Sequence, residues 1–460
     1  MGLKRLAFIL ASFGSALTPA IHAQQTSEQD KIVELQRKIE ELDRRLAAAE
    51  ARSQPASAKP AKPAADAGRA SETSNAGIVT AGPGGFVIRS TDGDYTLKIG
   101  ADLQADIRTF TGTGSGPLND QILLRRIRPT LSGTLYKKID YYIRPDFGQG
   151  TVVVSDAYVQ LNYIPRFSIR VGKFKPPVGL ERLQSDDDGT FIERGLPTLL
   201  APSRDIGFQL SGDLISRRLG YQVGVFNGVP DNSLSDVSPS GHRSYAARLF
   251  ATPFASGRQN VLSGLGFGVA AEGGNTDGVG LPAYKTAGQN TFFTFSSGVI
   301  SAGHRTVLAP QAYYYLGPFG LLAEYTVAEE EFQKNAVRRN VAFRSWQVEA
   351  SYVLTGEKKS FGGVTPRRPF APFDHGWGAW ELAVRTGDFR IDRGLFNYGF
   401  ASATASPSFA REWVGGVNWY LNRVFKISAD YAHTNFVGGA VGANRASERA
   451  ILTRFQLNFL

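Results

Sequence analysis

The stretch QILLRRIRPTLSGTLY, residues 121–136, decides how the rest of the chain is interpreted. Its apolar residues alternate with polar ones, which is the period of a β-strand whose two faces meet different surroundings. Arg126 and Arg128 share the polar face, whereas Arg125 has the opposite parity. Because arginines are rarely buried without partners, one face of this strand must be wet and must accommodate positive charge.

The same alternation recurs along the chain from residue 77 onward. In YTLKIGADLQADIRT, residues 95–109, every second residue is apolar and most of the residues between them are polar or charged. A soluble sandwich would turn the polar face to solvent, whereas a transmembrane barrel turns the apolar face to lipid and the polar face to its lumen. Strands of about ten residues match a tilted membrane crossing, which favours the barrel.

Aromatic residues give further support to a barrel. The chain ends in ILTRFQLNFL, residues 451–460, an alternating strand that closes on an aromatic residue followed by one leucine, and such strands are typical of outer-membrane barrels. Aromatic side chains near predicted strand ends fit interfacial girdles: Trp346, Tyr352, Trp380, Trp413, Trp419 and Tyr431. We therefore predict an all-β transmembrane barrel.

The alternating segments predict sixteen antiparallel strands. They lie at about 95–109, 123–136, 139–148, 152–163, 166–174, 205–213, 219–227, 243–251, 262–272, 306–315, 319–329, 343–355, 377–388, 410–422, 424–435 and 448–459. An even number places both chain ends on the periplasmic side. Segments around 228–242, 273–305 and 389–409 then become extracellular loops, and the apolar piece 291–295 belongs to one of them. The connection 356–376 is long, yet it falls on the periplasmic side.

The first 76 residues predict export and assembly. Residues 1–23 combine two basic residues, an apolar core and a proline, which is the pattern of a secretory signal peptide. Residues 24–50 carry apolar residues at spacings of three and four, which predicts a periplasmic coiled-coil helix for oligomerisation. A lone amphipathic helix on the barrel or membrane surface is the alternative. Residues 51–76 predict a flexible linker, so that the barrel occupies 77–460.

Charge and cysteine content narrow the possible functions. The chain has 51 Lys and Arg against 41 Asp and Glu, a formal net charge of +10. Such a balance suits nucleic acid, an anionic membrane surface or an anionic solute. Because the chain is predicted to be exported, we expect no nucleic-acid partner. The absence of cysteine excludes disulfides, thiolate metal sites and cysteine nucleophiles.

The alternation also predicts which basic residues line the lumen. Arg126, Arg128, Arg144 and Arg170 face inward by this rule, as do Arg248, Arg385 and Arg454. Sixteen strands leave a water-filled channel, and rings of Arg or Lys select anions in such pores. Guanidinium suits phosphate because its planar fork matches two oxygens. The alternative is that these arginines brace the wall by pairing with inward carboxylates: Asp102, Asp106, Asp146, Asp156 and Glu381.

The connection at about 173–205 is too long for a hairpin and holds an apolar run flanked by prolines. In a sixteen-stranded porin a loop at this place folds into the pore and narrows it. Several basic residues would then lie near the constriction: Lys173, Lys175, Arg182, Arg194 and Arg204. The three aspartates at 186–188 oppose that charge, and a solvated turn or a cation site are the alternatives for them.

Several motifs resemble a known family. LRRIRPTLSGTLYKKIDYYIRPDFG, DAYVQLNYIP, VGKFKPPVGLERLQS and FIERGLPTLL look like the phosphate-selective porins O and P of Gram-negative outer membranes, and the resemblance runs from about residue 90 to the end. It implies a homotrimer of sixteen-stranded barrels, surrounded by outer-membrane lipid, that pass inorganic phosphate or polyphosphate by diffusion. It also implies an arginine ladder leading to a constriction and a lysine-rich periplasmic exit.

The resemblance assigns roles to particular residues. Arg125 and Arg126 match the family's paired arginines, Lys173 and Lys175 fall in its GKFKPP stretch, and Asp156 falls in its DAY stretch as a counter-charge. Arg125 then either lies at the extracellular rim or is turned inward by a local bulge. A coiled coil occurs in only some members, and a three-stranded one would match a trimeric barrel.

Other functional classes find little support. A hydrolase would need Ser, His and a carboxylate near one barrel end, but the five histidines are scattered and none has metal-ligand spacing. GPGG at 82–85 does not precede Lys-Ser or Lys-Thr, so it is not a phosphate-binding loop. We expect no enzyme activity, no metal and no cofactor. A structural tether remains open, as does a non-selective or sugar-preferring porin of the same fold.

Overall fold

The computed structural model describes residues 77–111, 119–230, 235–238, 241–255, 260–278 and 280–460, together with Arg37, Lys38, Glu40, Glu41 and Arg44. The chain divides into two compact units, Met1–Thr73 and Ser74–Leu460. The predicted signal peptide (1–23) and linker (51–76) lie outside the described residues. So does the predicted coiled coil (24–50), apart from the five residues named above, which are helical and exposed.

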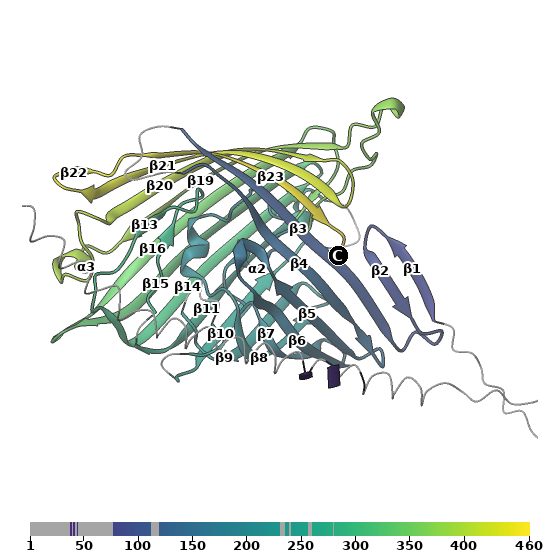
Figure 1. Ribbon diagram of the computed structural model, residues 1–460, viewed down its shortest axis with the longest axis horizontal. Helices are drawn as coiled ribbons and strands as arrows, with labels where there is room; N and C mark the ends of the chain where they lie inside the picture. Colours follow the sequence, from purple (N-terminus) through teal and green to yellow (C-terminus); the bar gives the residue numbers. More distant parts are fainter. Residues whose placement is uncertain are drawn as a thin grey trace, which may run out of the picture. The chain divides into compact units, whose positions relative to one another are not determined.

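Sixteen strands of the second unit form a closed antiparallel ring (Figure 1). In chain order they are β3 (Thr96–Phe110), β4 (Gln121–Leu135), β5 (Ile139–Asp146), β6 (Val153–Ile164), β7 (Phe167–Phe174), β8 (Asp205–Leu214), β9 (Leu219–Phe226), β10 (Ser244–Ala251), β11 (Leu265–Gly278), β14 (Ile300–Leu316), β15 (Phe319–Lys334), β16 (Val337–Val353), β19 (Ala379–Ile391), β20 (Pro407–Tyr420), β21 (Phe425–Ala440) and β23 (Glu448–Asn458). Each strand pairs with its neighbours, and β23 pairs with β3 from Ala450↔Phe110 to Asn458↔Asp102. The predicted barrel of sixteen antiparallel strands is confirmed.

The barrel is apolar outside and polar inside, as the alternation predicted. On β3, Leu103 and Ile107 are each 38% exposed, whereas Asp102 and Asp106 are each only 1% exposed. This inverts the pattern of a soluble protein and is the pattern that lipid requires. Among the residues that the structure describes, no helix is both long enough and apolar enough to cross a membrane.

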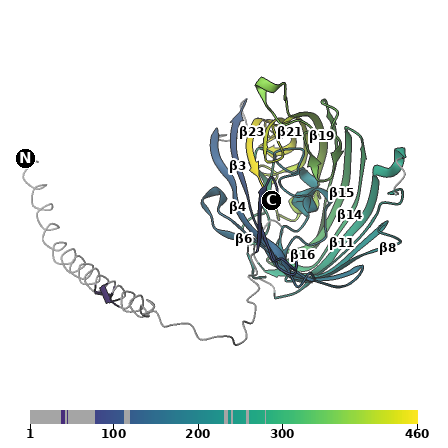
Figure 2. The ribbon, with the colours of Figure 1, turned by 90° about the vertical axis from the view of Figure 1, so that its right-hand side faces the viewer.

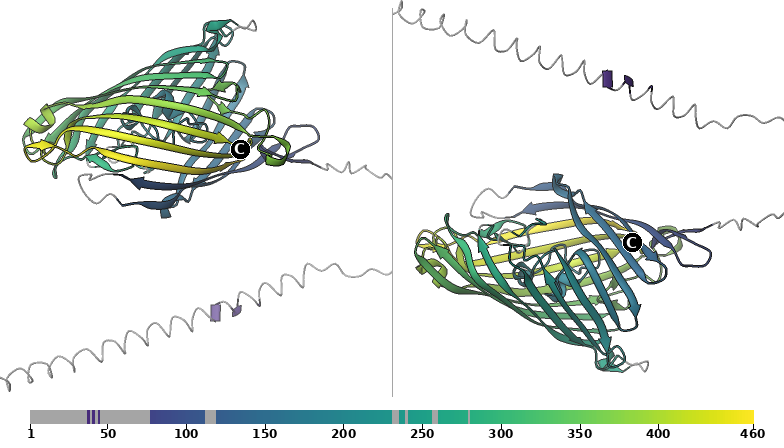
Figure 3. Two further views of the ribbon diagram at one scale, coloured as in Figure 1. Left: turned by 90° about the horizontal axis from the view of Figure 1, so that it is seen from above. Right: turned by 90° about the horizontal axis from the view of Figure 1, so that it is seen from below.

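A hairpin that the strand prediction did not include precedes the ring. β1 (Ile78–Gly82) and β2 (Gly85–Arg89) are joined by the GPGG turn, and β2 pairs with the first residues of β3. Figure 3 shows the hairpin and the C-terminus at one end of the barrel. We name this the terminal end, and the opposite one the loop end.

A long connection folds into the ring between β7 and β8, and we name it the constriction loop, residues 175–204. It contains α2 (Leu180–Leu183) and η2 (Leu196–Leu200), and it lies inside the ring of strands (Figures 1 and 2). Wall carboxylates hold its backbone. The N–H of Leu180 donates to Glu324 on β15 at 2.7 Å, and the N–H of Ile192 donates to Asp430 on β21 at 2.7 Å.

A second connection also turns inward, and we name it the mouth loop, residues 280–299. It forms a small sheet of β12 (Tyr284–Lys285) and β13 (Thr291–Phe293), so the apolar piece 291–295 lies in a loop as predicted. The loop is shorter than the predicted 273–305, because β11 and β14 extend farther. Its buried aromatic side chains meet lumen-facing rings of β16 and β19, as in Tyr284–Phe343 (5.3 Å between centroids) and Phe292–Phe389 (5.6 Å).

Part of the long connection at the terminal end also enters the lumen. This lower loop, residues 354–378, contains β17 (Lys359–Ser360), β18 (Gly363–Val364) and η4 (Pro372–Asp374). Lys359 Nζ lies 2.7 Å from Glu381 Oε1 and donates to Thr190 of the constriction loop at 3.1 Å. The remaining short elements are η1 (Gly148–Gly150), η3 (Val261–Gly264), α3 (Gly394–Asn397) and β22 (Ala443–Asn444).

The aromatic girdle is clearest at the terminal end. Trp380 and Trp419 stack there at 5.0 Å on the outer face, and Tyr352 is half exposed nearby in β16. Trp346 and Trp413 instead lie in the middle of β16 and β20, because both strands run farther toward the loop end than the sequence pattern indicated.

Candidate anion-binding site

A bulge in β4 decides the direction of Arg125. Gln104 pairs with Arg126 and Ala105 pairs with Leu124, so Arg125 is an extra residue that turns inward. A Cβ placed on Gly148 would lie 2.5 Å from the Arg125 carbonyl oxygen, so only glycine fits against the bulge. Of the two orientations considered for Arg125, the structure has the inward one.

Asp146 at the end of β5 forms hydrogen bonds with the backbone beside the bulge and with the side chain of Arg128. Its Oδ1 accepts the backbone N–H groups of Gly148 (2.9 Å) and Ile127 (3.3 Å). Its Oδ2 accepts Arg128 Nε at 2.7 Å. Backbone register and guanidinium direction are therefore set by one carboxylate.

Asp186 of the constriction loop lies among four guanidinium groups. Arg128 and Arg194 contact its carboxylate directly, and Arg126 Nε and Arg204 Nη2 lie at 3.6 and 3.7 Å. The Asp186 side chain is 2% exposed. Burial alone would raise the pKa of Asp186, but the charges of Arg126, Arg194 and Arg128 hold it well below its usual value, so that the carboxylate stays ionised.

Glu193 is the second acidic centre of the constriction loop. Its Oε1 lies 2.8 Å from Arg125 Nε, 3.1 Å from Arg108 Nη2 and 3.4 Å from Arg454 Nη2. Burial would raise the pKa of Glu193, but Arg125 and then Arg454 lower it below its usual value. The loop thus supplies one carboxylate to each of two neighbouring arginine groups.

These groups border a cavity of about 580 Å³, a size typical of small-molecule sites. Eight cationic side chains line it: Arg125, Arg126, Arg128, Lys173, Arg182, Arg194, Arg204 and Lys285. Three acidic side chains line it too: Asp146, Asp186 and Glu193. The lining is therefore positive by five formal charges. Of the thirteen basic residues that the sequence predicts to face the lumen or to lie near the constriction, seven meet here.

Arg144 and Arg170 face the lumen away from this cavity. Arg144 Nη2 lies 3.3 Å from Asp102 and 3.2 Å from Asp187, so two carboxylates neutralise it. Arg170 donates to Gln160 Oε1 at 2.9 and 2.6 Å. Its guanidinium also lies 4.2 Å from the ring centre of Tyr158, a cation–π contact.

The two lysines of the GKFKPP stretch separate. Lys173 lines the cavity, and its ammonium contacts Asp236. Lys175 does not line the cavity, since its Nζ donates to the backbone oxygen of Gln184 at 2.8 Å. Burial and the nearby Arg194 lower the pKa of Lys175 well below its usual value.

The carboxylates named as wall braces do pair with basic residues. The pairs are Asp102 with Arg144, Asp106 with Arg454, Asp146 with Arg128, Asp156 with Arg204 and Glu381 with Lys359. Bracing and pore lining therefore coexist. Arg144 and Arg454 pair with wall carboxylates outside the cavity lining, whereas Arg128 and Arg204 are paired and also line the cavity.

Of the aspartates at 186–188, Asp186 and Asp187 belong neither to a solvated turn nor to a cation site. Their side chains are each 2% exposed, and arginines contact both. Within the described ranges, no group of three or more His, Cys, Asp or Glu side chains is arranged to hold a metal ion.

The sequence interpretation missed Lys285, which reaches the cavity from β12 of the mouth loop. The sequence pattern predicts that this segment belongs to an extracellular loop, where a lysine gives no indication of a place in the lumen. The usable signal was the apolar piece 291–295 in the same loop, since exposed loops rarely hold consecutive aromatic residues that must be buried.

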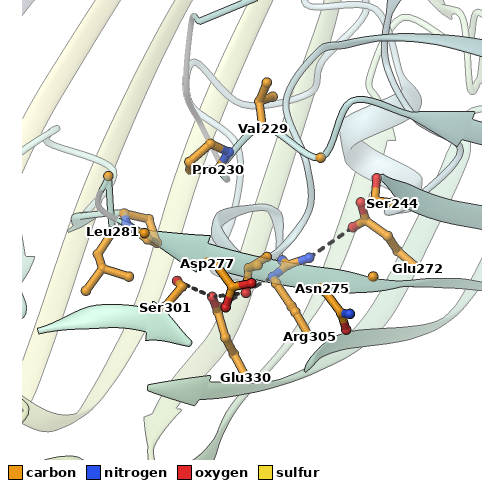
Figure 4. Close-up of a pocket in the computed structure, with 16 residues that line it drawn as sticks. Val229, Pro230, Ser244, Glu272, Asn275, Asp277, Leu281, Ser301, Arg305 and Glu330 are labelled. Atoms are coloured by element: carbon orange, nitrogen blue, oxygen red, sulfur yellow. Dashed lines mark hydrogen bonds and ion pairs between the residues drawn. The ribbon is translucent and has the colours of Figure 1, made fainter. Parts of the chain in front are cut away.

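A smaller cavity of about 50 Å³ adjoins this one toward the loop end (Figure 4). Arg305 lies in it between two carboxylates, 3.1 Å from Glu272 and 3.6 Å from Glu330. Ser301 donates to Glu330 at 2.6 Å. Because two carboxylates already neutralise Arg305, this cavity does not suit an anion.

Comparisons with known proteins agree with this architecture. The sequence model of the family Phosphate-selective porin O and P matches residues 97–459. Porin O of Pseudomonas aeruginosa is 25% identical over 395 residues, covering 78% of this chain and 87% of that protein. The crystal structure of the outer membrane channel DcaP of Acinetobacter baumannii has a TM-score of 0.53 at 9% identity, covering 81% of this chain and 99% of that one. This structural likeness supports the fold alone.

Proposed function

Because the chain belongs to the phosphate-selective porin O and P family, it is an outer-membrane porin and not an enzyme, and we propose that its channel passes phosphate and related oxyanions by diffusion. The observation that carries this proposal is the cavity beside the constriction loop, whose eight cationic and three acidic side chains favour anions. Six of the eight cations are arginines, whose forked donors match phosphate oxygens.

The polar lining of this cavity favours a selective pore over a non-selective diffusion channel. Arg125, Arg126 and Arg128 come from a strand of the wall, while Arg194 and Arg204 come from the constriction loop. A solute that passes between them meets donors from two sides. Such convergence gives a multi-contact site for a small oxyanion, whereas a single row of arginines would only attract it.

Planar-bilayer recordings test the proposal. In a KCl gradient the reversal potential is expected to show a preference for chloride over potassium, and added phosphate is expected to reduce the chloride current at millimolar concentration. A preference for potassium would refute anion transport. Chloride selectivity without inhibition by phosphate would leave a general anion porin, and inhibition by neutral sugars instead would favour a sugar-preferring one.

We further propose that the protein is a homotrimer, with a coiled coil of residues 24–50 in the periplasm of a Gram-negative bacterium. The heptad spacing of that segment supports oligomerisation. The position of both barrel termini at one end supports a helix on the periplasmic side. The terminal end would then face the periplasm and the loop end the exterior. The linker 51–76 would join the helix to the barrel.

A further inference from the structure

We propose that three arginines on the outer face of the barrel bind a phosphorylated lipid headgroup in the membrane leaflet at the loop end. We name them the arginine patch: Arg344 on β16, Arg390 on β19 and Arg411 on β20. The patch lies outside the pore, so this inference does not depend on which solute the channel passes. It gives the barrel wall a specific contact with lipid, where the alternation of residues alone predicts an apolar surface.

The direction of the patch follows from the alternation of buried and exposed side chains. On β19, Arg385 is buried on the lumen side, whereas Val384 is 55% exposed on the lipid side. Arg390 shares the parity of Val384, and its side chain is 61% exposed. Arg411 is 56% exposed on β20, and Arg344 is exposed on β16. All three side chains therefore point away from the pore.

The patch lies at the height where the hydrocarbon of the membrane ends. Arg390 comes ten residues after Trp380, which belongs to the aromatic pair at the terminal end. At a rise of about 3.3 Å per residue and a tilt of about 40°, this is roughly 25 Å along the barrel axis, the height of the apolar band of such barrels. Trp413 is exposed on the outer face two residues after Arg411, toward the terminal end, as an interfacial aromatic residue would be. The guanidinium groups therefore meet lipid headgroups rather than acyl chains.

The charges of the patch are only partly neutralised by the protein. Arg344 and Arg390 are directly opposite each other in β16 and β19, a relation in which like charges destabilise a sheet. Asp388, whose side chain is 1% exposed, lies 3.2 Å from Arg390 and 3.7 Å from Arg411. Glu329 shares the outer face on β15, but the strand register places it opposite no arginine. An anion supplied by the lipid would relieve the repulsion that remains.

The geometry of the patch suits a phosphate group. The guanidinium carbons of Arg411 and Arg390 lie 5.3 and 5.8 Å from the ring centre of Phe409, so one ring orients both groups by cation–π contacts. Asp388 contacts the same two guanidinium groups and keeps them side by side. More than half of each side chain stays exposed, which leaves N–H donors for a ligand. Forked guanidinium donors match the oxygen pairs of a phosphate.

The test compares the wild type with Arg344→Gln/Arg390→Gln. The control, Arg217→Gln/Arg218→Gln, removes two exposed arginines from the turn between β8 and β9 at the terminal end. Full-length protein in a non-ionic detergent is titrated with bisphosphorylated lipid A, and bound lipid is counted by native mass spectrometry. The patch variant is expected to raise the lipid concentration for half-saturation by about tenfold or more, because two charged hydrogen-bond donors are lost. The control is expected to stay within about twofold of the wild type.

Two further arms identify the source of the phosphate. Lipid A stripped of its phosphates is expected to bind the wild type at least about tenfold more weakly. Inorganic phosphate at millimolar concentration is expected not to displace bound lipid A, because the acyl chains also contact the apolar wall. Equal binding of the stripped lipid would show that the apolar wall alone binds lipid and would overturn the inference. Displacement by inorganic phosphate would overturn it as well, since the patch would then be a site for the free anion.

The variants themselves give the remaining outcomes. Equal binding of lipid A by the patch variant and the wild type overturns the inference. So does dissociation of the oligomer with unchanged lipid binding, which would make the patch a contact between copies of this chain. If the double variant does not fold, Arg344→Gln and Arg390→Gln are tested singly. Each is expected to weaken lipid A binding by about threefold or more, and wild-type binding by both overturns the inference. Chloride selectivity is expected to be unchanged in every patch variant, so a failure of the proposed channel function is recorded separately.

Discussion

At the scale of single residues, the three arginines of β4 differ in what neutralises them. Arg125 forms a two-point contact with Glu193, at 2.8 and 3.2 Å. Arg128 is bound by two carboxylates. Arg126 has its nearest carboxylate at 3.6 Å, and its other contact is the neutral oxygen of Gln104 at 2.6 Å. Arg126 is therefore the least compensated of the three and the best placed to bind a solute.

This difference predicts the effect of replacing Arg126. Arg126→Gln is expected to raise the phosphate concentration for half-inhibition of chloride current by about tenfold or more, because a charged hydrogen bond contributes about 1.5–3 kcal/mol. The control is Arg411→Gln, which removes an arginine that is 56% exposed on β20. Equal inhibition of both variants would show that overall charge, rather than the cavity, governs phosphate binding.

The two acidic residues that the constriction loop contributes to the cavity predict that chloride selectivity does not change with pH. In Asp186 and Glu193 the pKa is lowered in the folded protein, so each stays ionised well below neutral pH. A lowered folded-state pKa contributes stability above the unfolded value of about 4, and this stability is lost only as pH falls through the folded value. Chloride selectivity from reversal potentials is therefore expected to be unchanged from pH 8 to 5. A marked change between pH 6 and 5 would contradict these directions.

At the scale of elements, the bulge in β4 depends on a glycine in another element. Gly148→Ala would bring a Cβ to within 2.5 Å of the Arg125 carbonyl oxygen, and backbone atoms cannot yield cheaply. We expect the bulge to shift and the Arg125–Glu193 contact to weaken. The free energy of unfolding is expected to fall by about 1–3 kcal/mol. Gly415→Ala is the matched control, because nothing lies within 4 Å of its added Cβ. Thermal unfolding and phosphate inhibition of both variants measure the effect.

The constriction loop is held by wall carboxylates, and this predicts a second element-scale effect. Asp430→Ala leaves the N–H of Ile192 without its acceptor, which costs about 1–3 kcal/mol for a buried donor. The loop is then expected to exchange amide hydrogens faster and to give noisier single-channel currents. Asp213→Ala, at an exposed position of β8, is expected to change neither. Unchanged exchange in Asp430→Ala would mean that other contacts suffice to hold the loop.

The strands could be predicted from the sequence because lipid imposes a strict period of two on them. Leu103 and Asp102 follow that rule, and so do most residues of the ring. The period of two does not predict the bulge at Arg125, because the register of β4 against β3 changes there and the bulge packs against a glycine more than twenty residues away. Lys285 was missed for a related reason. Its loop is ordered by aromatic contacts with four separate strands, and no local pattern encodes them.

At the scale of the whole barrel, the inward loops are held by charged side chains of several strands. Carboxylates of β15, β20 and β21 accept backbone N–H groups of these loops, as Glu324, Glu412 and Asp430 do. Arginines of β4 contact loop carboxylates instead and also border the cavity. The arginines of β4 therefore combine loop anchoring with a basic lining. A net charge of +10 does not reveal this arrangement, because it does not say where the charges lie.

The two-unit organisation of the chain predicts that conduction and assembly can be separated. Deleting residues 24–50 while keeping the predicted signal peptide removes the heptad segment and leaves the barrel unit, Ser74–Leu460, complete. We expect the variant to fold and to keep its chloride selectivity and phosphate inhibition, because the lining of the cavity lies wholly within that unit. We expect its oligomer to dissociate at lower temperature in detergent, because a three-stranded coil would no longer support the trimer.

A deletion of residues 55–66, within the linker, serves as control for chain length. Equal thermal stability of the full-length and 24–50-deleted oligomers, measured by native gel, would show that the helix does not hold the barrels together, and lost selectivity would tie it to the pore.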